Sequence, residues 1–234
     1  MSKITVSVII VHYNTPELLH NCIHSIRTFT KDIHYEIIVI DNNSTKKPVI
    51  RNSADLQYIE NTKNLGFAKA NNQGAIHANG QFLFLLNSDT VLHDNLIYDC
   101  WFQFKNSKKI GALGPKLLNE DGSTQSYGSI LGRRAYKGNK TKKVSFLSGA
   151  ALMIQKELYL SIGGFDEHYF FYNEDLDICK TLRNKGYDLI YYPNSALTHF
   201  GGKSTVMNST LKKQAYKSSW YFLKKHYLSK IFRN

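Results

Sequence analysis

Residues 6–17 read VSVIIVHYNTPE, a strand pattern followed at once by a helix start. Val6–Val11 is an apolar run rich in β-branched side chains, as expected for a strand that is buried on both faces. Thr15-Pro16-Glu17 then supplies a helix cap, a proline for the first helical position and an early acid. We therefore expect a buried strand that leads directly into a helix ending near Arg27.

The same alternation continues along the chain. Further strands are predicted at Glu36–Ile40, Leu56–Ile59, Phe82–Leu86, Phe146–Ile154 and Asp188–Tyr192. Further helices are predicted at Phe67–Ala78, Asn95–Lys105, Glu174–Lys185 and Ser209–Phe232, and the stretch Gly128–Lys143 is expected to be a mobile loop. The pattern predicts an α/β fold with a mostly parallel central sheet and flanking helices. Such sheets bind ligands at the carboxyl ends of their strands.

Composition limits the class of protein. The chain has 234 residues, of which 42% are hydrophobic, enough for one sizeable core. The three cysteines have no metal-ligand spacing and indicate core thiols in a reducing compartment. Neither a signal peptide nor a stretch long enough to cross a membrane is recognised, so we expect a cytoplasmic protein.

The formal net charge is +12, and no acid follows Asp188. Arg133, Arg134 and four lysines between residues 137 and 143 form a second basic group. A basic surface can attract nucleic acid, anionic lipid or a phosphorylated substrate.

Polar side chains follow the predicted strands. Asn87-Ser88-Asp89 could hold a hard cation on a diphosphate, or form an ordinary turn. Asp41 could accept a hydrogen bond from the N3–H of uracil or thymine, or make an Asx turn. Tyr13-Asn14 ends the first strand, where Tyr13 could stack on a base. Gly66 opens a helix whose N-terminus could approach a diphosphate.

The segment GGFDEHYFFYNEDLD, residues 163–177, combines acids with aromatic residues. Glu174 and Asp175 follow the run Phe170-Phe171-Tyr172, where desolvation would raise the pKa of a carboxyl group toward useful basicity. His199 follows the last predicted strand, as a structural histidine or as a metal ligand.

Seven segments together resemble glycosyltransferase family 2, the inverting enzymes with a GT-A fold, and most closely its bacterial rhamnosyltransferase-like branch. They are SVIIVHYN, EIIVIDNNS, NLGFAKANNQG, FLFLLNSDT, LSGAALMI, GGFDEHYFFYNEDLD and THFGG, and they cover about residues 5 to 205. The resemblance implies a GT-A domain over 1–205, with a nucleotide-sugar-binding half (1–92) and an acceptor-binding, catalytic half (93–205). Residues 206–234 would add a basic amphipathic helix.

The resemblance also implies roles for single residues. Asp89 matches the last acid of the family's DXD motif and would hold Mn²⁺ or Mg²⁺ on the donor diphosphate, with Asn87 in place of the first acid and Ser88 between them. His199 matches a late histidine that completes the metal shell in some members. Asp175 matches the catalytic base. The donor-side residues would be Tyr13, Asn14, Asp41 and Gly66, and the acceptor-side residues Glu174 and Asp166.

The implied reaction moves rhamnose or a hexose from a dTDP- or UDP-sugar to a saccharide acceptor, linked in this branch to undecaprenyl diphosphate. The terminal helix either packs its aromatic line (Tyr216, Trp220, Leu223, Tyr227, Ile231) on the domain or turns its lysines to the inner face of the cell membrane. We expect peripheral membrane contact and no nucleic-acid partner. The alternatives are an inactive scaffold of this fold and a sugar-1-phosphate nucleotidyltransferase, whose Gly-rich basic loop is absent after the first strand.

Overall fold

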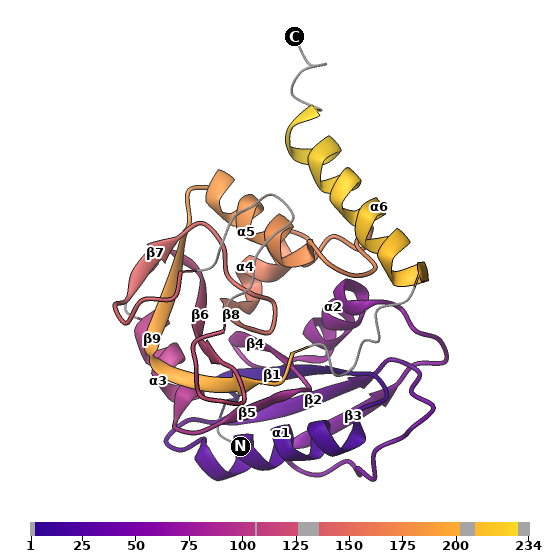
Figure 1. Ribbon diagram of the computed structural model, residues 1–234. Helices are drawn as coiled ribbons and strands as arrows, with labels where there is room; N and C mark the ends of the chain where they lie inside the picture. The colour runs from indigo at the N-terminus through magenta and orange to yellow at the C-terminus, as the bar shows by residue number, and fades with distance from the viewer. Residues whose placement is uncertain (1–2, 106, 126–135, 202–208, 229–234) are drawn as a thin grey trace.

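The computed structural model describes residues 3–105, 107–125, 136–201 and 209–228, with side chains in the last range from residue 212 onward (Figure 1). The strands are β1 (Val6–His12), β2 (Tyr35–Asp41), β3 (Leu56–Glu60), β4 (Phe82–Asn87), β5 (Thr90–Leu92), β6 (Ile110–Leu118), β7 (Lys142–Val144), β8 (Ala151–Gln155) and β9 (Asp188–His199). The helices are α1 (Pro16–Phe29), α2 (Phe67–His77), α3 (Leu96–Lys105), α4 (Lys156–Ser161), α5 (Glu174–Asn184) and α6 (Ser209–His226).

The strands form a single sheet in the order β3-β2-β1-β4-β8-β6-β9-β5, with β7 paired to β9. The pairings among β3, β2, β1 and β4 are parallel, as the alternation of strands and helices predicts. Beyond β4 the sheet is mixed, because β8 runs antiparallel to both β4 and β6, whereas β6 and β9 are parallel. The predicted α/β fold class is confirmed.

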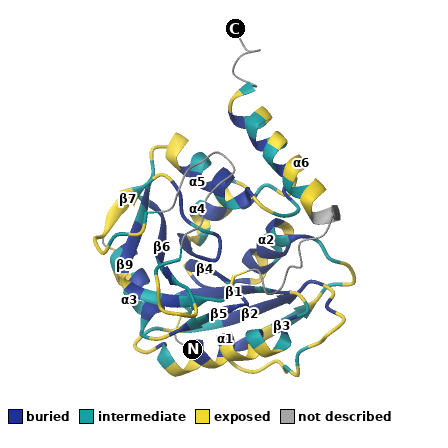
Figure 2. Ribbon diagram, in the orientation of Figure 1, coloured by how far each residue is buried: buried dark blue, intermediate teal, exposed yellow. Residues whose placement is uncertain are grey.

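Both faces of the sheet are covered, and each carries its own apolar cluster (Figure 2). Val8 and Ile10 of β1 pack with α1 and α3 on one face, whereas Ile9 packs with α2 and α5 on the other. This alternation buries successive β-branched side chains on opposite faces. Helix α2 approaches β1 closely at Gly74, where a Cβ atom would lie 2.4 Å from Cγ2 of Ile9.

Several elements differ from the sequence predictions. Strands β5 and β6 and helix α4 were not predicted; β6 contains Gly111, Gly114 and Pro115, which weaken a strand signal. The strand predicted at Phe146–Ile154 begins only at Ala151.

Strand β9 continues past the predicted end at Tyr192 to His199. Its pairing with β6 shifts register between Pro115 and Lys116, so residues 193–195 form an irregularity within the strand rather than a turn that ends it.

The predicted loop Gly128–Lys143 ends in β7, whose Lys142 and Lys143 pair with β9. Residues 126–135, including Arg133 and Arg134, lie outside the described residues, as do 229–234 with the predicted end of the terminal helix. Among the described residues, no helix is both long and apolar enough to cross a membrane.

Helix α6 docks through a different face from the predicted aromatic line. Phe222 and His226 are buried against the domain, whereas Tyr216 and Trp220 are 77% and 63% exposed. The residues that contact the domain are instead Ser218, Phe222 and Lys225, which are spaced so that they share one face of the helix. Ser218 donates a hydrogen bond to the loop before α5, and Lys225 donates one to α5 itself. The periodic pattern thus predicted a helix, but Tyr216 and Trp220 of the predicted aromatic line face outward.

Candidate active site

Parallel pairing brings the ends of three strands together. His12 at the end of β1 pairs with Asp41 of β2, and Val11 pairs with Asn87 of β4. The polar residues that were predicted at separate strand ends therefore share one edge of the sheet, where open α/β sheets bind their ligands.

The carboxylate of Asp41 is fully buried and is bound by the protein itself. One oxygen accepts a hydrogen bond from the hydroxyl of Tyr58 at 2.6 Å and lies 3.4 Å from Nδ1 of His12, and the other accepts from the backbone N–H of Ser44 at 2.7 Å. Burial by itself would raise the pKa of Asp41, but the hydrogen bonds from His12, Tyr58 and Ser44 outweigh it and hold this pKa below its usual range. Asp41 of β2 therefore links β1, through His12, and β3, through Tyr58, at the rim of the site.

The other residues predicted on the donor side take distinct positions around this rim. Tyr13 is 38% exposed, which leaves its ring available for stacking. Asn14 has a left-handed backbone (φ 59°), and its side-chain oxygen accepts hydrogen bonds from the backbone N–H groups of Thr45 and Lys46. Asn14 thus holds the loop that follows β2.

Gly66 lies at the start of α2 with φ 84°, and a Cβ atom there would lie 2.6 Å from the carbonyl oxygen of Phe170. The backbone N–H of Gly66 donates to Asn64, and that of Phe67 donates to the carbonyl of Phe170 at 3.1 Å. Gly66 therefore permits the close approach of the loop before α5, and both of these N–H groups have protein partners.

Asn87, Asp89 and His199 come together although they are far apart in the sequence. Thr90 of β5 pairs with His199 of β9, which places Nε2 of His199 3.3 Å from Oδ1 of Asp89 and 3.3 Å from Nδ2 of Asn87. Asp89 and Ser88 are buried. The predicted relation between the acid after β4 and the late histidine is thus present as a contact.

Gln125 orients His199 through two hydrogen bonds. Its side-chain Nε2 donates to the carbonyl of His199 at 3.1 Å, so its Oε1, which lies 2.8 Å from Nδ1 of His199, is an acceptor. Nδ1 of His199 therefore carries a proton, and Nε2 is the ring nitrogen that faces Asn87 and Asp89.

These residues fit a divalent cation. Asn87 contacts Nε2 of His199, which lies beside the carboxylate of Asp89, and Oδ1 of Asn87 is buried without a hydrogen-bond partner among the described residues. Oxygen atoms and a neutral imidazole are ligands for Mn²⁺, and oxygens alone suit Mg²⁺. Within the described ranges, no three histidine, cysteine or acidic side chains group closely enough to hold a metal. A donor diphosphate would have to supply the remaining ligands.

Glu174 and Asp175 begin α5 directly after two residues with left-handed backbones. Burial, and for Glu174 also the neighbouring carboxylate of Asp175, raises the pKa of both groups above the usual range. The backbone N–H groups of Gly149 and Leu176 donate to the two oxygens of Asp175 at 3.2 and 2.8 Å. Oε2 of Glu174 is buried and unpartnered among the described residues.

A short link joins Asp175 to the cation site. Gly149 donates to Asp175, and the carbonyl of the next residue, Ala150, accepts from the backbone N–H of Asn87 at 2.9 Å. Asp175 and Asn87 therefore flank the same short segment before β8.

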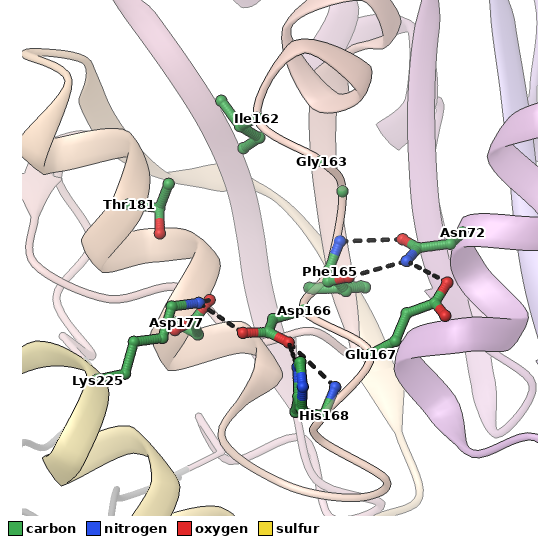
Figure 3. Close-up of a pocket in the computed structure, with 11 residues that line it drawn as sticks. Asn72, Ile162, Gly163, Phe165, Asp166, Glu167, His168, Asp177, Thr181 and Lys225 are labelled. Carbon is green, nitrogen blue, oxygen red and sulfur yellow. Dashed lines mark hydrogen bonds and ion pairs between the residues drawn. The ribbon is translucent and has the colours of Figure 1, made fainter.

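Asp166, predicted on the acceptor side, faces α6. Its carboxylate accepts hydrogen bonds from His168, from Tyr221 at 3.0 Å and from Lys225 at 2.7 Å. It lines a pocket of about 490 Å³ between the 162–168 loop, α5 and α6 (Figure 3). Asp175 is not among the residues that line this pocket.

Sequence reasoning missed Tyr58, Gln125 and Lys225. Each acts on a predicted residue, namely Asp41, His199 and Asp166. Tyr58 lies on a predicted strand, but Gln125 lies in a loop with no pattern of its own, and nothing local distinguishes Lys225 from the other lysines of the terminal helix.

With this geometry established, comparison with known proteins defines the class. Glycosyl transferase family 2 matches residues 7–163, which is more than half of the chain. The chain therefore belongs to this family, in agreement with the resemblance of its motifs.

Two curated relatives illustrate the similarity. The O-antigen biosynthesis protein RfbC of Myxococcus xanthus is 24% identical over 217 residues, which cover 83% of this chain and 17% of that protein. The N-acetylglucosaminyl-diphospho-decaprenol L-rhamnosyltransferase of Mycobacterium tuberculosis is 29% identical over 140 residues, which cover 49% of this chain and 46% of that protein. The chain spans less than half the length of either relative.

Solved structures confirm the GT-A fold. GalNAc-T7 in complex with UDP, GalNAc and Mn²⁺ superposes with a TM-score of 0.70 at 17% identity, covering 97% of this chain and 57% of that chain. TarS of S. aureus superposes with a TM-score of 0.68 at 18% identity, covering 94% of this chain and 40% of that chain.

The substitution Asp41→Asn should lower the free energy of unfolding by about 2 kcal/mol at neutral pH, because the amide offers one acceptor oxygen where the carboxylate has two. The pKa of Asp41 is lower in the folded than in the unfolded chain. Its stabilising contribution is therefore complete above the unfolded value of about 3.9 and is lost as the pH falls from there toward the folded value.

Urea unfolding at a series of pH values measures the difference in the free energy of unfolding between wild type and Asp41→Asn. This difference should shrink below a pH of about 4. Asp55→Asn is the matched control, because Asp55 forms a partly exposed ion pair with Arg27 and should cost less than about 1 kcal/mol. An Asp41→Asn difference that stays constant over the whole pH range would contradict this account.

Proposed function

We propose that this protein is an inverting glycosyltransferase that moves a sugar from a dTDP- or UDP-sugar to a saccharide acceptor. The observation that carries the proposal is the short link described above. The backbone N–H of Gly149 donates to Asp175, and the carbonyl of Ala150 accepts from Asn87. The desolvated carboxylate of Asp175 therefore lies near the cluster of Asn87, Asp89 and His199, which suits a cation-bound diphosphate. A base beside such a cluster is what transfer from a sugar nucleotide requires.

The proposed reaction assigns a step to each group. Asp175 removes the proton from an acceptor hydroxyl, whose oxygen attacks the anomeric carbon from the face opposite the nucleotide. The new carbon–oxygen bond forms as the bond to the diphosphate breaks, and the configuration at that carbon inverts. Asn87, Asp89 and His199 would hold a divalent cation, which when bound neutralises charge on the leaving diphosphate. Tyr13 would stack on the nucleobase of the donor nucleotide.

The sugar is proposed to be rhamnose or a hexose, and the acceptor a lipid-linked saccharide in cell-surface polysaccharide synthesis. The similarity to an O-antigen biosynthesis protein of M. xanthus and to a rhamnosyltransferase of M. tuberculosis supports this assignment. Both dTDP- and UDP-linked donors therefore belong in the first assays.

We also propose that α6 holds the protein at an anionic membrane surface, the inner face of the cell membrane. Tyr216 and Trp220, four residues apart, are neighbours on its outward face. Lys212, Lys213 and Lys217 are exposed on the same helix. Aromatic residues insert at the headgroup level while lysines bind anionic lipid, each lysine contributing about 1 kcal/mol.

Asp175→Asn should lower kcat by about 10² to 10⁴ while leaving the affinity for the donor nearly unchanged, because the base acts on the acceptor. The wild-type rate should fall as the pH falls through the raised pKa of Asp175, well above the ordinary value of about 3.9. Initial rates and donor calorimetry measure both effects. Asp188→Asn, at the far end of β9, is the control, and full activity of Asp175→Asn would refute the assignment.

Asp89→Ala should weaken binding of dTDP or UDP in the presence of Mn²⁺ at least about tenfold and should leave binding without metal unchanged. Isothermal calorimetry with and without Mn²⁺ measures the metal-dependent part. Asp55→Ala, which removes an acid from the surface, controls for loss of charge. Metal dependence that survives in Asp89→Ala would show that Asp89 is not a ligand.

The double variant Tyr216→Ser/Trp220→Ser should bind vesicles of anionic phospholipid about tenfold more weakly than wild type, because it loses two interfacial rings. Co-sedimentation measures the bound fraction, and Val49→Ser, at a still more exposed apolar position in a loop, serves as control. Equal binding by the double variant and wild type would exclude the outer face of α6 as the membrane contact.

A further inference from the structure

The segment that carries Asp175 has a backbone that its own sequence does not favour. Tyr172 and Asn173 are consecutive and have φ values of 67° and 71°, in the left-handed region. Neither is glycine; asparagine adopts this conformation more readily than most residues, but a bulky residue such as tyrosine rarely does. Such a pair persists only where surrounding structure holds it in place, and it directly precedes Glu174 and Asp175.

Two helices hold this turn from different sides. On one side, the carbonyl of Phe170 accepts the backbone N–H of Phe67 at the start of α2. On the other side, the hydroxyl of Ser218 donates to the carbonyl of Phe171 at 2.9 Å, and the side-chain amide of Asn173 donates to Ser219 at 3.1 Å. Helix α6 therefore contacts the two residues on either side of Tyr172.

Lys225 of α6 joins the two ends of the segment. Its ammonium group donates to Asp166 at 2.7 Å and to Asp177 at 2.8 Å (Figure 3). Asp166 lies before the turn and Asp177 lies in the first turn of α5, with Asp175 between them in sequence. His226 binds Asp177 at 2.6 Å and Tyr221 binds Asp166 at 3.0 Å, so both carboxylates have a further partner on α6.

Lys225, Asp166 and Asp177 form a cluster of one cation and two carboxylates. Burial by itself would raise the pKa of Asp166, but hydrogen bonds from Lys225 and His168 hold this pKa below its usual range. Burial would lower the pKa of Lys225, but the two carboxylates raise it. Removing the ammonium would leave two partly buried carboxylates without the cation they share, which favours separation of the two ends.

We propose that α6 is a positioning element for the transfer reaction and that Lys225 is its positioning residue, holding segment 166–177 in the conformation that sets Asp175 in place. This inference rests on the proposed function. The docked and outward faces of α6 are distinct, so the same helix can contact a membrane and align the base. Among the described residues, Lys225 has no hydrogen bond or ion pair with Asp175, Asn87, Asp89 or His199, so it acts through the segment rather than on the substrate.

Lys225→Met tests the proposal, because methionine keeps much of the aliphatic stem and removes the charge. With a water-soluble acceptor, kcat should fall by at least about tenfold, since small misplacements of a reacting group cost this much or more. Donor affinity should stay within about twofold, because donor binding is assigned to the strand ends. Backbone N–H groups of residues 171–176 should exchange hydrogen faster.

Lys225→Arg should restore part of kcat, because a guanidinium can bridge both carboxylates. Lys185→Met is the matched control, because it removes the same charge from an exposed position at the other end of α5. It should leave kcat and exchange at residues 171–176 unchanged. If Lys225→Met fails to fold, Ser219→Ala removes one hydroxyl, which accepts from Asn173 and donates to the carbonyl of Ala215 in its own helix, and it should change kcat and exchange in the same direction.

Faster exchange at residues 171–176 with unchanged kcat would overturn the positioning role, and so would a loss of donor affinity that equals the loss of kcat. If wild type transfers no sugar from any donor, the proposed function fails and takes the catalytic role with it. The exchange data then still decide whether Lys225 holds the turn, so the two failures are distinguishable.

Discussion

The parallel pairing of β1 with β2 and β4 is the interaction on which the rest of the molecule depends. It buries successive residues of β1 in two separate apolar clusters, which attach helices to both faces of the sheet. It also ends the three strands at one edge, so that His12, Asp41 and Asn87 become neighbours. The hydrogen bonds of Asp41 then close this edge, because a buried carboxylate needs partners for both of its oxygens.

The second half of the chain completes the site by returning to this edge. Strand β8 enters antiparallel to β4, and the Gly149-Ala150 segment before it reaches both Asp175 and Asn87. Strand β9 ends at His199 beside Asp89. The carboxyl pair at the start of α5 is desolvated, whereas the cluster around Asp89 is rich in oxygen and nitrogen ligands. These opposite environments suit a proton acceptor and a cation, respectively.

The two faces of helix α6 lie in different environments. Its docked face meets Asp166 and Asp177, where Lys225 is bound by carboxylates. Its outward face combines Tyr216 and Trp220 with exposed lysines. Composition alone assigns all these lysines to one class, although their energetic roles differ, because a solvated cation contributes little to folding and a partly buried one must be paired.

Local pattern in the sequence determined the α/β class, the first four parallel strands and the residues at their ends, because periodicity and turn chemistry report burial and chain direction over a few residues. It also singled out Glu174-Asp175 and His199 by their residue types and surroundings. Tertiary structure alone decided that Gln125 orients His199, that Tyr58 binds Asp41 and that Lys225 joins Asp166 to Asp177. It also decided which face of α6 docks and how far β9 extends. These contacts join residues far apart in the chain, and their partners are selected by the geometry of the packed sheet, which no local pattern contains.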